Sequence, residues 1–194
     1  MRKFERSAEP DFLADKWERW GLEWEQRRKE KPAAQFHWHE IDGEKVDQKL
    51  LPFLKNQTQD HCSFCDAYPV APPSIETIEH FRPKTVFHKE AYQWANLYFC
   101  CTYCQQKGED YDEALLRPDA ADYEFDRYFR WDFTTGEAHV NTLASSEDQK
   151  SADVTIRLYR LNDGHPLCRK LAMKNRSENL GIPSDDQSYR HYVQ

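Results

Sequence analysis

The chain has 194 residues and a formal net charge of −7, a length that suits one sizeable domain or a small core with helical flanks. No apolar run reaches the roughly 20 residues that a membrane-spanning helix needs, and the charged start, residues 1–6, lacks the apolar segment of a signal peptide. We therefore expect a cytoplasmic protein without membrane contact. The net negative charge argues against a protein that binds nucleic acid without a partner, because such binding usually needs a basic face.

Residues 1–56 are predicted to form an N-terminal helical region. An apolar stripe with charged residues between its members follows helical spacing at Leu13, Trp17, Trp20 and Trp24. A second pattern of this kind is Val46, Leu50, Phe53 and Leu54. Large aromatic side chains occur both in cores and at interfaces, so the tryptophans are expected to form core or a docking face for another subunit.

Residues 57–115 contain two Cys-x-x-Cys pairs, which consist of Cys62, Cys65, Cys101 and Cys104. In a reducing cytosol this paired spacing favours metal over disulfides, and a redox motif normally needs only one pair. Four thiolates close a tetrahedral zinc site that has no open position, so we predict a structural zinc ion. Cys100 and Cys168 fall outside the pattern and are expected to be buried small hydrophobes, although Cys100 competes with Cys101 as a ligand.

The segment between the two cysteine pairs carries an acid followed directly by a histidine, Glu79-His80. A neutral imidazole can take a proton from water, and an adjacent carboxylate can hold a divalent cation against a scissile phosphate. Arg82 and Lys84 are placed to meet phosphate oxygens, and Lys107 is a third candidate. Such a pair is often a surface feature without a role, but its enclosure by two cysteine pairs favours a reactive site.

Residues 116–194 are predicted to form a β-hairpin followed by helices. Phe129, Trp131 and Phe133 alternate with polar residues, and a turn at 134–136 precedes a second short strand. Helical spacing then appears around Leu158 and again from Leu167. The basic residues of this stretch form a phosphate-facing patch or a solvated helix face; they are Arg157, Arg160, Arg169, Lys170, Lys174 and Arg176.

The order of these motifs resembles the HNH family of ββα-metal nucleases. The family pattern runs Cys-x-x-Cys, acid-His, Asn-Leu, then Cys-x-x-Cys followed by Lys-Gly, and here it is carried by Cys62/Cys65, Glu79-His80, Asn96-Leu97, Cys101/Cys104 and Lys107-Gly108. More narrowly, residues 78–84 and 94–97 are similar to the HNH subunit of Septu anti-phage systems, which also occurs with some retrons. The likeness covers roughly residues 58–112, with a weaker echo to about residue 172.

The resemblance implies a fold, a set of roles and partners. The fold would be α+β, a zinc-stapled, treble-clef-like ββα-metal core with helical flanks and a hairpin insertion. His80 would be the general base, Glu79 a ligand of a catalytic Mg²⁺ or Mn²⁺, and Asn96 the residue that tethers the loop and orients His80. The partners would be a nucleic-acid substrate, an ATPase subunit of the defence complex and, in retron-associated members, a reverse transcriptase complex.

The chain departs from the family pattern at Gln105, where an Asn or His usually serves as second metal ligand. Gln offers the same amide oxygen on a longer stem, and Gln106 or Asp110 are alternative ligands. Three functions follow: a metal-dependent endonuclease acting as a defence effector, a catalytically silent zinc-stabilised adaptor of such a complex, and a zinc-stabilised binding domain that shares only the cysteines. The intact Glu79-His80 and Asn96 favour the endonuclease.

Overall fold

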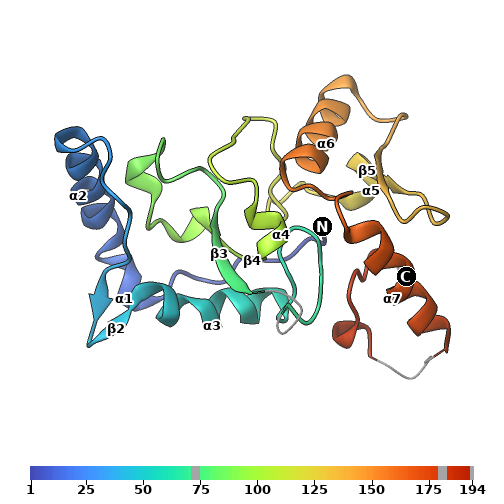
Figure 1. The fold of residues 1–194 in the computed structure, drawn as a ribbon, viewed down its shortest axis with the longest axis horizontal. Coiled ribbons are helices and arrows are strands. Elements are labelled where there is room, and N and C mark those ends of the chain that lie inside the picture. The colour runs from blue at the N-terminus through green and yellow to red at the C-terminus, as the bar shows by residue number, and fades with distance from the viewer. Residues whose placement is uncertain (71–74, 179–182, 193–194) are drawn as a thin grey trace.

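The structure is a computed structural model that describes residues 1–70, 75–178 and 183–192. Within these ranges it combines helices with small two-stranded antiparallel sheets, so the expected α+β class is confirmed (Figure 1). No helix in the described ranges is long and apolar enough to cross a membrane.

The N-terminal region is helical, as predicted, but is interrupted. Its elements are α1 (Asp11–Ala14), α2 (Trp17–Glu30), β1 (Glu40–Ile41), β2 (Glu44–Lys45) and α3 (Val46–Thr58). The predicted stripe is therefore divided between two helices, and Trp20 and Trp24 are buried in the core. The β1–β2 hairpin was not predicted, although Asp42-Gly43 is its signal, a two-residue turn with positive φ at both positions.

The central region places two strands and a short helix next to each other. It consists of β3 (Glu76–His80), η1 (His88–Glu90), η2 (Trp94–Asn96), β4 (Leu97–Cys101) and α4 (Thr102–Gln105). Strands β3 and β4 pair antiparallel, with Glu76 opposite Cys101 and His80 opposite Leu97. All five residues of β4 are buried, as expected of an apolar strand covered on both faces. Helix α3 packs against β4, and α4 packs against β3.

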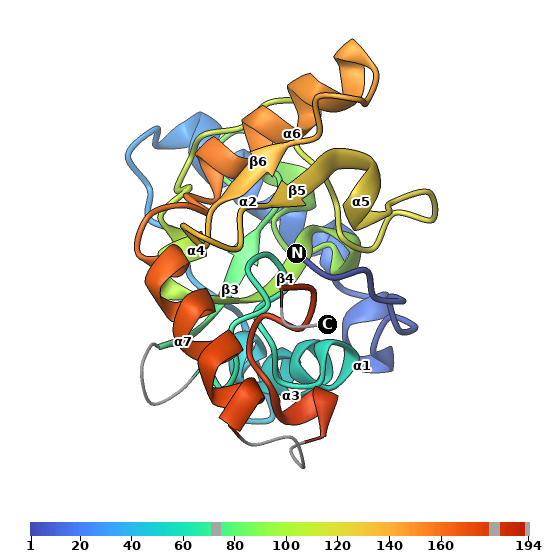
Figure 2. The same ribbon diagram turned by 90° about the vertical axis from the view of Figure 1, so that its right-hand side faces the viewer.

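The C-terminal region contains the predicted hairpin and helices. Its elements are α5 (Phe125–Tyr128), β5 (Phe129–Trp131), β6 (Ala138–Val140), α6 (Ser146–Leu158), α7 (His165–Glu178) and η3 (Ser184–Asp186). The hairpin pairs Phe129 with Val140. Ser145 caps α6 by accepting a 3.1 Å hydrogen bond from the Asp148 backbone N–H. Figure 2 shows α7 toward the left of the view, below α4.

A single hydrophobic cluster joins the three regions. It contains Trp20 and Trp24 of α2, the residues of β4, and Tyr159 and Tyr192 near the end of the chain. Helix α2 lies directly on η1 at Gly21, where a Cβ atom would stand 2.2 Å from the Lys89 carbonyl oxygen. Glycine is required there because the two backbones touch.

Candidate metal centre and catalytic site

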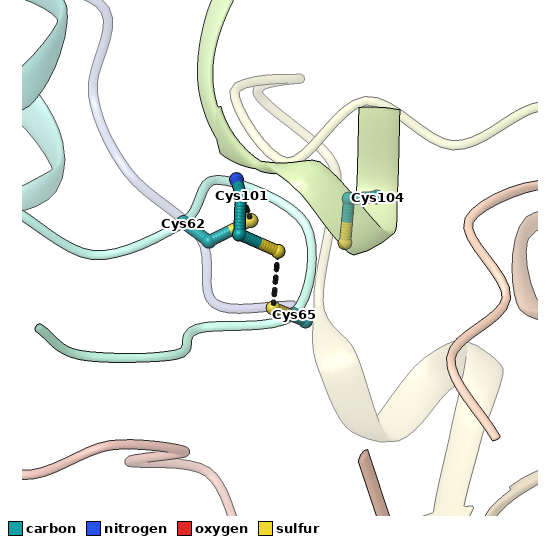
Figure 3. Close-up of side chains that lie close together, drawn as sticks. All are labelled: Cys62, Cys65, Cys101 and Cys104. Atoms are coloured by element: carbon teal, nitrogen blue, oxygen red, sulfur yellow. Dashed lines mark hydrogen bonds between the residues drawn. The ribbon is translucent and has the colours of Figure 1, made fainter. Parts of the chain in front are cut away.

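The four predicted zinc ligands meet at one place. Cys62 and Cys65 lie on the loop that follows α3, whereas Cys101 ends β4 and Cys104 belongs to α4 (Figure 3). All four are buried, and their sulfur atoms lie within 4.8 Å of one another. The sulfurs of Cys65 and Cys101 are 3.7 Å apart, too far for a disulfide, whose S–S bond is about 2.05 Å.

This geometry fits a tetrahedral metal such as zinc. Zn–S bonds of about 2.3 Å place the sulfurs of a tetrahedral site roughly 3.8 Å apart, close to the Cys65–Cys101 separation. Burial raises the pKa of the Cys65 and Cys104 thiols well above the usual range. Four thiolates therefore need a cation among them to share this space.

The two remaining cysteines stay outside the cluster. Cys100 is buried, as expected, and its thiol donates to the Cys101 carbonyl oxygen at 3.1 Å. It is not one of the grouped ligands, so its competition with Cys101 finds no support in the geometry. The expectation that Cys168 is buried was wrong: it is exposed on α7, because that side of the first turn faces solvent.

Glu79 is buried next to a buried lysine. Lys107 Nζ lies 2.9 Å from Glu79 Oε1, and both side chains are at most 5% exposed. The two groups form an ion pair without a well-directed hydrogen bond, because Glu79 Oε1 has no hydrogen-bond partner. Lys107 Nζ instead donates to the carbonyl oxygens of His80 and Asp110. Burial raises the pKa of Glu79 to about 7 against the opposing effect of Lys107.

His80 is held in one orientation and covered. Its Nε2 donates to the Ala91 carbonyl oxygen at 2.9 Å, which leaves Nδ1 as the basic nitrogen. Trp38 stacks on the imidazole with ring centroids 5.5 Å apart, and Phe36 meets it edge-on at 5.4 Å. Only 6% of His80 is exposed, and this burial lowers its pKa to about 3.

Asn96 fastens the loop between β3 and β4 from inside. Its Oδ1 accepts from the Arg82 backbone N–H at 2.7 Å, and its Nδ2 donates to the carbonyl oxygens of Arg82 and Glu90, each at 3.0 Å. The loop so closed carries Ala91, whose carbonyl binds His80. Asn96 thus holds the loop segment whose Ala91 carbonyl accepts the hydrogen bond from His80.

A catalytic divalent cation does not fit this arrangement as it stands. Such a cation prefers carboxylate oxygens, and the only group of three or more Cys, His, Asp or Glu ligands in the described part of the chain is the cysteine cluster. Glu79 is already paired with Lys107. Gln105 lies on α4, and its Nε2 donates to the Ile78 carbonyl oxygen of β3 at 3.4 Å.

The alternative ligand Gln106 and the predicted phosphate-binding cations have other partners in this structure. Gln106 accepts a hydrogen bond from Arg160, and Arg82 pairs with Glu90 and Glu113. The Lys84 ammonium lies 5.3 Å from the Phe36 ring centroid. Asp110, the other alternative ligand, is exposed, and only its backbone carbonyl accepts a hydrogen bond from Lys107.

The largest cavity near the site lies on the other side of Asn96. It measures about 700 Å³ and is bordered by α2, Arg82, Asn96 and Arg117. Neither Glu79 nor His80 lines it. The cavity therefore gives no direct access to the Glu79–His80 pair, and the rings of Phe36 and Trp38 cover His80.

Two features of the site escaped the sequence analysis. The pairing of Lys107 with Glu79 arises because α4 folds back onto β3, and no spacing rule indicates it. The aromatic cover carried a weak signal, since Phe36 and Trp38 alternate with histidines as in an extended segment with one apolar face.

Comparison with known proteins assigns the chain to no family. No family model matches the chain, and no curated protein matches its sequence.

Proposed function

We propose that the chain is a zinc-stapled HNH-type endonuclease that hydrolyses phosphodiester bonds of nucleic acid. The observation that carries the proposal is the anchoring of His80: the bond from Nε2 to the Ala91 carbonyl fixes Nδ1 as the proton acceptor, on a loop that Asn96 closes. A general base needs this fixed tautomer. The β3–β4–α4 order around four grouped cysteines supports the same proposal.

The chemistry asked of His80 is the activation of water. Nδ1 takes a proton from a water molecule while the water oxygen forms a bond to phosphorus. The bond from phosphorus to the leaving sugar oxygen breaks, and that oxygen takes a proton from solvent. Lys84 and Lys107, which flank Glu79, bring positive charge toward the phosphate.

Activity would depend on opening the site. The aromatic cover excludes substrate, and a base with a pKa of about 3 accepts protons poorly. Displacement of Phe36 and Trp38 would rehydrate the imidazole and raise its pKa. This conditional behaviour is consistent with the effector subunit of an anti-phage complex, activated by its ATPase partner. Binding of Mg²⁺ or Mn²⁺ would likewise require Lys107 to leave Glu79.

A catalytically silent adaptor is the second candidate, and the Lys107–Glu79 contact favours it. The Lys107 ammonium, 2.9 Å from the Glu79 carboxylate, neutralises the charge that a bound metal ion would otherwise neutralise. In such an adaptor the zinc centre would still organise the fold. The two candidates differ in one observable, namely cleavage that requires His80.

The test is a cleavage assay on labelled plasmid DNA and total RNA with Mg²⁺ or Mn²⁺, with the protein alone and with its ATPase partner. His80→Ala should abolish cutting while zinc content and folding remain. His139→Ala is the matched control, because His139 is exposed on β6 far from the site. Cutting retained in His80→Ala removes His80 from the mechanism. No cutting by the wild type under any condition, with zinc bound, selects the adaptor.

A further inference from the structure

Arg169 on α7 is a fully buried cation without an acidic partner. Its side chain is 0% exposed, and no carboxylate pairs with it among the described residues. Its Nη1 and Nη2 donate to the carbonyl oxygens of Gly136 and Leu161 at 2.9 and 2.8 Å, while Nε has no hydrogen-bond partner there. Hydrogen bonds to carbonyls solvate a guanidinium but leave its charge uncompensated.

The two other buried Lys and Arg side chains of the described residues are paired, whereas the buried amino terminus of Met1 adds a further positive group near Arg169. Lys107 lies against Glu79, and Arg190 makes a 2.7 Å ion pair with Asp66. A buried charge is normally paired because its desolvation is otherwise costly. Among the buried Lys and Arg side chains, Arg169 is thus the exception, because it has no carboxylate partner.

The cysteine centre can supply the missing negative charge. A divalent metal with four thiolates would carry a net charge of −2, and Arg169 is close enough to Cys65 and Cys104 to interact with their charge. Tyr189 connects the two: its ring centroid is 5.7 Å from the Arg169 guanidinium, and its backbone N–H donates at 2.7 Å to the carbonyl of Asp66, which follows Cys65. Burial lowers the pKa of Arg169, and the Cys65 and Cys104 thiols oppose that effect.

The position of α7 also ties this residue to the centre. Helix α7 begins at His165, whose ring lies 5.5 Å from that of Tyr103, the neighbour of Cys104 on α4. The basic stretch that contained Arg169 is therefore not uniformly a phosphate-facing patch. Arg169 points inward, because α7 packs this side of its first turns against the β5–β6 hairpin.

We propose that Arg169 is the internal counter-charge of the four-thiolate metal centre, a positioning residue that raises its zinc affinity. This inference rests on the zinc assignment in the proposed function but not on nuclease activity. Arg169 does not contact the metal. It lowers the cost of collecting four thiolates in a buried space, as outer groups do around other metal ligands.

The test measures the zinc dissociation constant by competition with a chromophoric chelator, together with the zinc content per chain. Arg169→Gln should weaken zinc binding about 10- to 100-fold, and Arg169→Lys, which keeps the charge, should recover most of the loss. Lys170→Gln, an exposed neighbour on the same helix, should bind as the wild type does.

The outcomes separate the two claims. If the wild type holds no zinc, the metal assignment fails. If it holds one zinc and Arg169→Gln binds equally tightly, or Arg169→Lys and Arg169→Gln are equally weak, Arg169 is a packing residue and the inference is overturned. Should Arg169→Gln fail to fold, Arg169→Lys still decides: near wild-type affinity supports the counter-charge, and a loss as large as about 100-fold contradicts it.

Discussion

The molecule contains two buried ionic centres that handle charge in opposite ways. The cysteine centre gathers four potential anions and leaves their charge to an added cation, with Arg169 beside it. The Glu79 site balances its carboxylate internally through Lys107. The first centre has the ligands for a metal ion, whereas the carboxylate of the second already has an internal cation. Two buried anionic positions in one fold can thus differ in whether the chain itself supplies the counter-charge.

The largest effect is expected from removal of a cysteine ligand, which tests whether the cysteine centre depends on a metal ion. Cys62→Ser should lose zinc and soluble yield together, because binding of a structural zinc contributes on the order of 10 kcal/mol to folding. Mass spectrometry for zinc and circular dichroism for folding check this. Cys168→Ser is the control, since Cys168 is exposed and outside the cluster. A stable, metal-free Cys62→Ser protein would refute the structural role of the centre.

Removal of Lys107 tests the self-balanced site. Lys107→Met should lower the free energy of unfolding by about 3–5 kcal/mol, because it leaves Glu79 buried without its partner. Adding Glu79→Gln to this variant should restore part of the loss. Urea denaturation measures both, with Lys170→Met as the exposed control.

The same variant asks whether Lys107 excludes a cation. Mn²⁺ should stabilise Lys107→Met more than it stabilises the wild type, because the carboxylate is then free to bind it. Equal effects of Mn²⁺ on the two proteins would show that the lysine does not compete for this position.

Asn96→Ala should lower the free energy of unfolding by about 3 kcal/mol. Asn96 makes three hydrogen bonds to the loop backbone, and the substitution leaves the backbone groups that it binds without a partner. The zinc content should not change, because Asn96 touches none of the cysteines. Hydrogen exchange should locate the loosening in residues 82–91. Loss of zinc in this variant would mean that the two centres are not independent.

The smallest effect concerns pH. His80 has a folded pKa of about 3 against an ordinary value of 6.5, so the unfolded chain binds a proton first and stability is lost as pH falls from 6.5 towards 3. Between pH 7 and pH 5 the wild type should lose about 2 kcal/mol more than His80→Gln. Because zinc release affects both proteins alike, their difference isolates His80. Parallel pH profiles would show that the imidazole is already accessible.

The sequence predicted features that depend on local spacing better than those that depend on packing. The cysteine pairs indicated one shared site, and the alternation around Phe129 and Trp131 indicated a hairpin. The inward turn of Arg169 was not predictable, because a basic residue in a helical pattern normally faces water and only the Gly136 and Leu161 carbonyls reveal otherwise. The closure of Glu79 by Lys107 likewise depends on how α4 meets β3.

The backbone contact at Gly21 connects the position of α2 to that of η1. The α2 backbone contacts the Lys89 carbonyl directly, because Gly21 has no side chain. A shift of α2 toward η1 would therefore displace the segment that begins at η1. That segment leads within two residues to Ala91, whose carbonyl holds the imidazole. The position of α2 and the position of the carbonyl that fixes the His80 ring are therefore linked by direct backbone contact, with no side chain at Gly21 that could adjust between them.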